Sequence, residues 1–265
     1  MRLFDIHQHL GSRERLTGRM TRYEFTEAVQ KHLRYMDKHE IERACLIASH
    51  NSLLRSPDDV REVNTRIAEA CRIAPDRFVA GAGTVDPGIG DRGLAEIDYC
   101  ARELGLPAIA WHTRFQGTFL DSGSVRRYVE HAASLDMTIF LHILGESTSE
   151  AAWRLTAIAE EFPQVRIVAL DAFTSFDQGE WVVSVGGKTS NVTYDLSLMF
   201  PDAAFIAKFV AAYGSQRLVF GTDYYDDMEL RVPVGRYAVE MAGLSAADQD
   251  NICWRNASRL LGLAE

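Results

Sequence analysis

The sequence predicts a single α/β domain of the (β/α)8 TIM-barrel class, and three observations carry that prediction. The chain has 265 residues, which suits one barrel of roughly 250 residues. Short apolar stretches alternate with helical patterns along the whole chain, and no linker or shift in composition divides it. The apolar stretches are almost continuously hydrophobic, as expected of parallel strands covered by helices. We expect one domain over residues 1–265, with a doubly wound open sheet as the alternative.

The expected strands are the apolar stretches that lie between turn signals. In chain order they are Arg2–Ile6, Arg43–Ser49, Arg77–Val85, Pro107–Trp111, Met137–Leu141, Val165–Leu170, Asn191–Asp195 and Arg217–Thr222. The third strand leads into Asp86-Pro87-Gly88, a strong turn signal. The first leads into His7 and His9 rather than a glycine-rich nucleotide turn, which disfavours the open sheet.

The expected helices follow from apolar periodicity and from capping residues. In Asp58–Ala74 the apolar side chains keep to one stripe, and Ser-Thr-Ser-Glu at 147–150 is a candidate cap for the helix that follows. Gly105 and Gly186 mark helix ends. The full set is Thr21–Lys38, Asp58–Ala74, Asp91–Leu104, Ser122–Leu135, Ser147–Phe162, Gln178–Val185, Asp202–Tyr213 and a capped tail from Ser245 to Leu263.

The charge of the chain excludes some partners. The net charge is −9 without a basic cluster, which argues against nucleic acid and acidic membrane surfaces. No apolar run approaches the roughly 20 residues of a membrane span, and polar residues stand where a secretory signal would need an apolar core. We expect a cytoplasmic protein acting on a small molecule. Its oligomeric state stays open, with a homodimer among the candidates.

Chemistry-bearing residues gather where the expected strands end, which is where the active sites of such barrels lie. His7 and His9 are two residues apart and share one face of a strand, so they present two imidazoles for a metal. His142 follows the fifth strand, Asp171 the sixth and Asp223 the eighth. A lone aspartate at such a junction is often a helix cap, but the joint pattern favours a site. The other residues at strand ends are His50, Asp86, His112, Arg114, Asp195 and Ser197.

Four segments resemble a known family. They are Asp5-Ile-His-Gln-His-Leu-Gly11, Phe140-Leu-His142, Gly221-Thr-Asp223-Tyr and the tail Asn251–Gly262. Together they resemble the amidohydrolase superfamily. The branch they are most similar to is amidohydrolase-2, which includes lactone and amide hydrolases and aromatic-acid decarboxylases related to aminocarboxymuconate-semialdehyde decarboxylase. The resemblance runs along essentially the whole chain.

The resemblance implies one divalent metal ion held by His7, His9, His142 and Asp223. It also implies that Asp223 is the general base toward a metal-bound water, whose pKa a divalent ion lowers to about 7. Zinc is the expected ion, and manganese and iron also suit these ligands. The family's bridging lysine on the fourth strand is absent, which favours a single ion.

One position departs from the family pattern. Asp171 stands where the family usually has a histidine after the sixth strand. Its carboxylate can hydrogen-bond a ligand, bind a metal or serve as an acid, so we include it among the catalytic candidates. The departure puts in doubt any mechanism that needs the histidine, decarboxylation in particular.

Four residues are candidates for contact with the substrate. Arg55 and Arg114 carry guanidinium groups suited to bidentate pairing with a carboxylate. His112 is placed for a second metal or for substrate, and Tyr224 follows the expected base. A substrate that bears a carboxylate would suit the two arginines.

The first functional expectation is a metal-dependent hydrolase that uses a metal-activated water on a small ester, lactone, amide or thioester. The alternative is a metal-dependent lyase that decarboxylates or hydrates a small unsaturated or aromatic acid. A metal-free, degenerate barrel is the second alternative, for which Asp171 is the argument.

Overall fold

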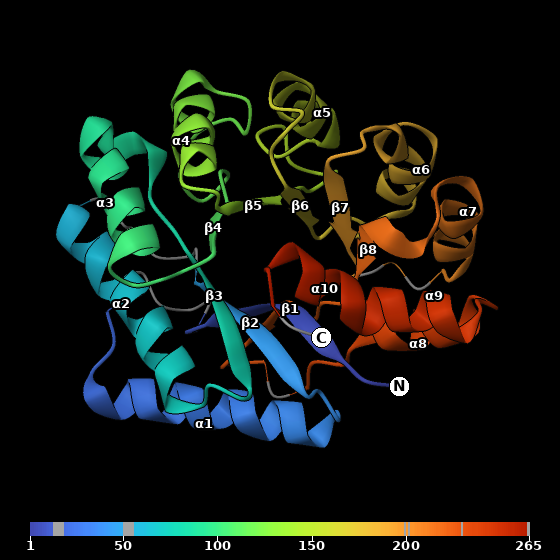
Figure 1. Ribbon diagram of the computed structural model, residues 1–265, viewed down its shortest axis with the longest axis horizontal. Coiled ribbons are helices and arrows are strands. Elements are labelled where there is room, and N and C mark those ends of the chain that lie inside the picture. The colour runs from blue at the N-terminus through green and yellow to red at the C-terminus, as the bar shows by residue number, and fades with distance from the viewer. Residues whose placement is uncertain (13–18, 50–55, 199, 201, 229, 264–265) are drawn as a thin grey trace.

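The chain folds as the expected barrel, in a computed structural model that describes residues 1–12, 19–49, 56–198, 200, 202–228 and 230–263. A ring of parallel strands lies inside and the helices lie outside (Figure 1). The order along the sheet is β8-β7-β6-β5-β4-β3-β2-β1-β9. The strands are β1 Phe4–Leu10, β2 Arg43–Ala48, β3 Phe78–Gly83, β4 Ala108–Trp111, β5 Thr138–His142, β6 Ile167–Leu170, β7 Val192–Asp195, β8 Leu218–Val219 and β9 Tyr224–Tyr225.

The eighth strand is interrupted, contrary to the single strand Arg217–Thr222 expected from its apolar run. β8 pairs with β7 and β9 pairs with β1, so the two short pieces close the ring together. The link between them is fixed to β1, since Ile6 N donates to Phe220 O (3.0 Å) and Asp223 N to His7 O (2.8 Å). The two pieces are separated because Phe220 N donates to Ile252 O in the tail (3.0 Å) and because Asp223 has a φ of 51°, in the left-handed region.

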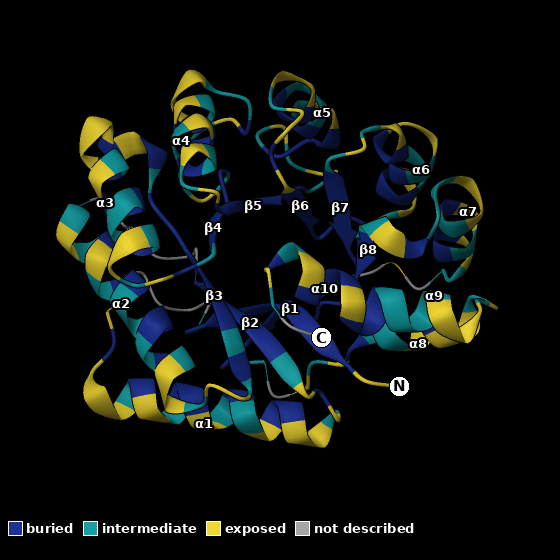
Figure 2. Ribbon diagram, viewed as in Figure 1, coloured by how far each residue is buried: buried dark blue, intermediate teal, exposed yellow. Residues whose placement is uncertain are grey.

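The helices cover the outside of the ring. They are α1 Arg22–Lys38, α2 Pro57–Ile73, α3 Asp91–Arg102, α4 Gly123–Ser134, α5 Ala152–Glu161, α6 Phe176–Ser184, α7 Ala204–Tyr213, α8 Val234–Met241, α9 Ala246–Asp250 and α10 Asn256–Leu260. Figure 2 shows their outer faces exposed and the strands buried. Among the described residues, no helix combines the length and the apolar character that crossing a membrane requires.

Two helices correct the sequence expectations. The cap expected at residues 147–150 is wrong, because α5 begins only at Ala152 and Ala151 makes no side-chain cap bond. Glu150 turns inward and binds His112 instead. α8 had not been expected. The tail does begin with the expected cap at Ser245, which accepts from Asp248 N, and then continues as α9, a π-turn at Asn251–Arg255 and α10.

The apolar core has two parts, one between strands and helices and one inside the ring. The inner part contains Phe4, Ile6, Phe140 and Val219, and the tail adds Trp254, Ala257 and Leu261 to it. Thr138 Oγ1 donates to Leu260 O (3.0 Å), which fixes the tail against the start of β5. The tail therefore closes the end of the ring where the strands begin. The polar residues described next lie at the other end.

Candidate metal centre

A β-bulge in β1 directs the two histidines into the ring. Phe4 and Ile6 face the inner core, so regular alternation would place Gln8 inside as well. The pairing of β1 with β2 shifts register between Asp5 and Gln8, and beyond the shift His7 and His9 point inward. Bulges near active sites commonly re-aim side chains in this way. The expectation that His7 and His9 share one face is confirmed.

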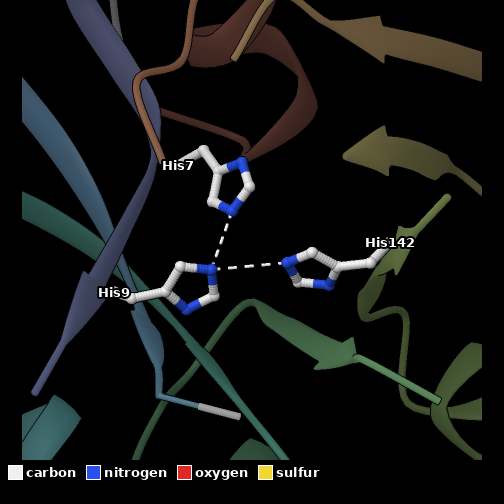
Figure 3. A group of neighbouring side chains, drawn as sticks. All are labelled: His7, His9 and His142. Carbon is white, nitrogen blue, oxygen red and sulfur yellow. Dashed lines mark hydrogen bonds between the residues drawn. The ribbon is translucent and has the colours of Figure 1, made fainter. Parts of the chain in front are cut away.

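The imidazoles of His7, His9 and His142 converge on one point (Figure 3). His9 Nε2 is 2.8 Å from His7 Nε2 and 3.3 Å from His142 Nε2. Two ligands held about 2.1 Å from one ion lie about 3.0–3.4 Å apart, depending on the coordination angle. The spacing of the three nitrogens therefore suits a shared metal ion.

Hydrogen bonds at the opposite ring nitrogens fix which nitrogen faces the centre. Nδ1 of His7 is 2.7 Å from Asp195 Oδ2, that of His9 is 3.1 Å from Ala48 O, and that of His142 is 2.9 Å from Trp111 O. Carboxylate and carbonyl oxygens only accept, so each Nδ1 donates. In a neutral ring Nε2 then carries a lone pair. Three lone pairs that face one another are stable around a cation, so the donor set fits a divalent metal.

Asp223 lies beside two of the three imidazoles and is the fourth candidate ligand. Its Oδ1 lies 3.5 Å from His7 Nε2 and 3.4 Å from His9 Nε2. Its Oδ2 faces Arg231, whose Nη2 is 3.6 Å away. The left-handed backbone at Asp223 is strained for a residue with a side chain, and such strain concentrates at functional sites. The structure thus brings His7, His9, His142 and Asp223 together.

Asp171 lies behind His7 rather than beside the three Nε2 atoms. Its Oδ1 accepts from Ser197 Oγ (3.0 Å) and is 4.0 Å from His7 Nδ1, and its φ is 59°. Burial raises the pKa of Asp171, and burial together with the charge of Asp171 raises the pKa of Asp223 to about 8. Burial lowers the pKa of His7, but the bond to Asp195 outweighs it and the pKa is raised to about 9. Buried carboxylates crowded in this way favour a cation among them.

Asp195 positions His7, and we expect Asp195→Asn to weaken metal binding about 10- to 100-fold. The carboxylate is fully buried and is itself held by Ser197 N (3.0 Å). Competition with a chelator measures the change. The matched control is Asp86→Asn, because Asp86 also follows a strand but accepts from Gly88 N in a turn. Equal metal affinities in the two variants would contradict the role of Asp195.

Gly221 allows strand eight to approach His7 and Asp195 closely. A Cβ on this residue would overlap Asp195 Oδ1 and lie 2.9 Å from His7 Cβ. We expect Gly221→Ala to lower the free energy of unfolding by about 1–3 kcal/mol and to weaken metal binding. Gly123→Ala, where nothing lies within 4 Å, is the control and should be neutral or slightly stabilising. Urea unfolding compares the two, and similar midpoints would refute the steric argument.

His112 directly follows β4 and lies beside the candidate metal ligands. Its ring is parallel to that of His142, with centroids 4.0 Å apart and planes 2° apart. Its Nδ1 is 2.6 Å from Oε1 of the fully buried Glu150, which also accepts from Arg114 N (3.0 Å). Burial raises the pKa of Glu150 to about 8. His112 thus lines the site, and the carboxylate of Glu150 orients it. The sequence had suggested Glu150 only as part of a helix cap.

The other substrate-contact candidates are placed differently. Arg114 Nε lies 3.5 Å from Glu150 Oε2 at the rim. The structure does not bring Tyr224 to the centre, because its ring stacks on Tyr35 in the outer core, 3.8 Å between centroids. Its neighbour Tyr225 faces the site and stacks on His9 (4.4 Å). Arg55 and His50 lie outside the described residues.

Two contributors to the site were not among the residues predicted from the sequence. Asp5 accepts from Thr222 N (3.0 Å) and Thr222 Oγ1 (2.6 Å), and it thereby joins β1 to the broken strand. Arg231 lies in a loop without a motif, yet it approaches Asp223. The position of Asp5, two residues before His7, was a hint in the sequence that it contributes to the site.

The fold and the converging side chains define a (β/α)8 barrel with a candidate metal site at the mouth. The family model described as amidohydrolase, of the amidohydrolase-2 branch, matches residues 4–263. The chain therefore belongs to the amidohydrolase family of enzymes, as the sequence motifs indicated. No curated protein sequence matches it.

Solved structures share the fold over nearly the entire chain. A 5-carboxyvanillate decarboxylase from Sphingomonas paucimobilis has a TM-score of 0.73 at 14% identity, with 99% of each chain covered. A manganese-bound dihydroxybenzoic acid decarboxylase from Polaromonas sp. JS666 has 0.70 at 18%, covering 98% of this chain and 97% of its own. A 4-oxalomesaconate hydratase from Rhodopseudomonas palustris has 0.70 at 14%, covering 98% and 95%. At these identities the likeness establishes the fold.

Proposed function

We propose that this protein is a metal-dependent lyase that decarboxylates or hydrates a small unsaturated or aromatic acid. The observation that carries the proposal is the convergence of three Nε2 atoms and one carboxylate oxygen at the mouth of an amidohydrolase-2 barrel. The relatives of similar fold are named as decarboxylases and a hydratase, which favours this reading over hydrolysis. Hydrolysis, the first expectation from the sequence, becomes the second candidate.

His7, His9, His142 and Asp223 would hold the metal. When bound, a divalent ion supplies Lewis-acid polarisation of a substrate oxygen. Zinc and manganese both suit three imidazoles and a carboxylate, and the manganese in the Polaromonas structure makes manganese the first ion to test.

The protein residues contribute orientation, exclusion of water and a proton. The side chains of His7 and His9 are fully buried and that of Asp223 is 8% exposed. In decarboxylation the bond from carbon to the carboxyl group breaks, its electron pair stays on the carbon, and carbon dioxide leaves. That carbon then takes a proton, which we assign to Asp223 at Oδ2. Asp171 and Ser197 hold the outer side of His7 and thereby keep its ring oriented.

The test is a comparison of product release by the metal-loaded protein. Manganese- and zinc-loaded samples are offered hydroxylated benzoates, small unsaturated acids, and a panel of lactones and esters. The proposal expects carbon dioxide release, or water addition seen by NMR, from at least one acid. Acid release from lactones or esters, without either lyase reaction, would establish hydrolysis instead. Less than about 0.2 equivalents of bound metal would overturn both and leave the metal-free barrel.

A further inference from the structure

A cavity of about 680 Å³ opens beside the metal centre, after β9. The described residues that line it are Asp227, Met228, Leu230, Arg231, Val232 and Val234. Its volume lies within the range of small-molecule sites, roughly 300–1,000 Å³. Four of these six side chains are apolar, so the lining suits a small hydrophobic body. Arg231 is the cation among them.

Arg231 lines the cavity and also lies close to Asp223. Its Nε donates to Thr222 O (2.7 Å), which fixes the base of the guanidinium against the broken strand. Its Nη2 lies 3.6 Å from Asp223 Oδ2. That separation exceeds a direct hydrogen bond, for which donor and acceptor lie 2.7–3.2 Å apart. The side chain is 18% exposed, so the group is neither buried in the protein nor fully solvated.

The two terminal nitrogens of this guanidinium make one long ion pair, from Nη2 to Asp223 Oδ2 (3.6 Å). Within the part of the chain that the structure describes, neither has an acceptor at hydrogen-bond distance. A planar fork without a close hydrogen-bond acceptor, next to the candidate metal ligands and over an apolar lining, has the form of a carboxylate anchor.

The lining also contains a carboxylate, that of Asp227. Asp227 Oδ2 accepts from Ser12 Oγ (2.9 Å), so that oxygen is directed toward the β1 end of the site. Arg114, the rival carboxylate anchor, has an ion pair of similar length, 3.5 Å from its Nε to Glu150 Oε2, but it is not among the described residues that line the cavity. Arg231 is therefore the cation that an acid in this cavity would meet.

We infer that Arg231 binds the carboxylate of an aromatic or similarly apolar acid whose body occupies the cavity at 227–234. The inference deepens the proposed function and rests on it for the reacting end of the substrate. It assigns the specificity for a negatively charged substrate to the loop after β9. It also makes Arg231 a substrate-binding residue that touches the acid directly.

The test compares two probes of the same shape, benzoate and benzamide, which differ in charge. Calorimetric titration of the metal-loaded protein should show benzoate bound at least about tenfold more tightly than benzamide. Arg231→Gln should reduce the ratio to about one, and Arg231→Lys should give an intermediate ratio because it keeps charge but loses the fork. Arg114→Gln is the matched control and should keep the wild-type ratio.

Each outcome bears on a separate claim. A wild-type ratio near one, or an unchanged ratio in both Arg231 variants, overturns the inference. Loss of the ratio in Arg114→Gln instead assigns the carboxylate to the other side of the mouth and also overturns it. Metal content is measured in every sample. If the wild-type protein holds no metal, the proposed lyase function fails, whereas the benzoate ratio still reports on Arg231.

Discussion

Asp223→Asn is expected to abolish turnover while part of the bound metal remains. The amide keeps an oxygen that can face His7 and His9, at the place where Oδ1 now lies 3.5 and 3.4 Å from their Nε2 atoms. It has no exchangeable carboxyl proton, so the rate should fall about 10²- to 10⁴-fold. Metal analysis and turnover of the acid found in the product-release assay measure the two effects separately.

Asp91→Asn is the control, because this aspartate lies on the surface and pairs with Arg127. It should leave both metal content and rate unchanged. A near-normal rate in Asp223→Asn would show that another group moves the proton. Asp171 would then be the first residue to test, since it is the nearest other buried carboxylate that the sequence proposed for catalysis.

The second large effect is expected from His9→Gln, which should weaken metal binding at least about a hundredfold. His9 Nε2 is the central atom of the cluster, with close contacts to His7, His142 and Asp223. Its loss would therefore remove the nitrogen atom that the other three candidate ligands have as a close neighbour. His131→Gln on α4, where the ring faces Asp98, is the control. If His9→Gln bound metal as tightly as that control, the ion would lie elsewhere.

Much of the fold followed from local pattern, because each βα unit has its own signals. Ser245 caps α9 as expected, and the helix expected from Thr21 begins at Arg22 with Thr21 as its cap. The eighth strand was misjudged because its apolar run does not reveal a backbone break. That break depends on Asp223 being held in a left-handed conformation by its bond to His7 O, which only the closed ring supplies.

The convergence of His7, His9, His142 and Asp223 was predictable because strand ends meet at one mouth in any such barrel. The groups that orient the ligands were not, since they come from distant segments or carry a second plausible role. Glu150 contacts His112, which lies 38 positions earlier in the chain. Glu150 itself belongs to a stretch with the pattern of a helix cap. Asp195 was recognised as a strand-end residue, but its bond to His7 crosses 188 positions. Arg231 lies in a loop whose sequence has no recognisable motif.

The meeting of β1 with the broken eighth strand also sets when the centre can form during biosynthesis. The bonds from Thr222 to Asp5 join residues 217 positions apart, and Asp223 follows directly. At about 5–20 residues per second, the ribosome needs about 10–40 s to make the intervening chain. His7 and His9 therefore exist long before their carboxylate partner does. A metal ion held by all four residues would have to bind after the eighth strand has been made.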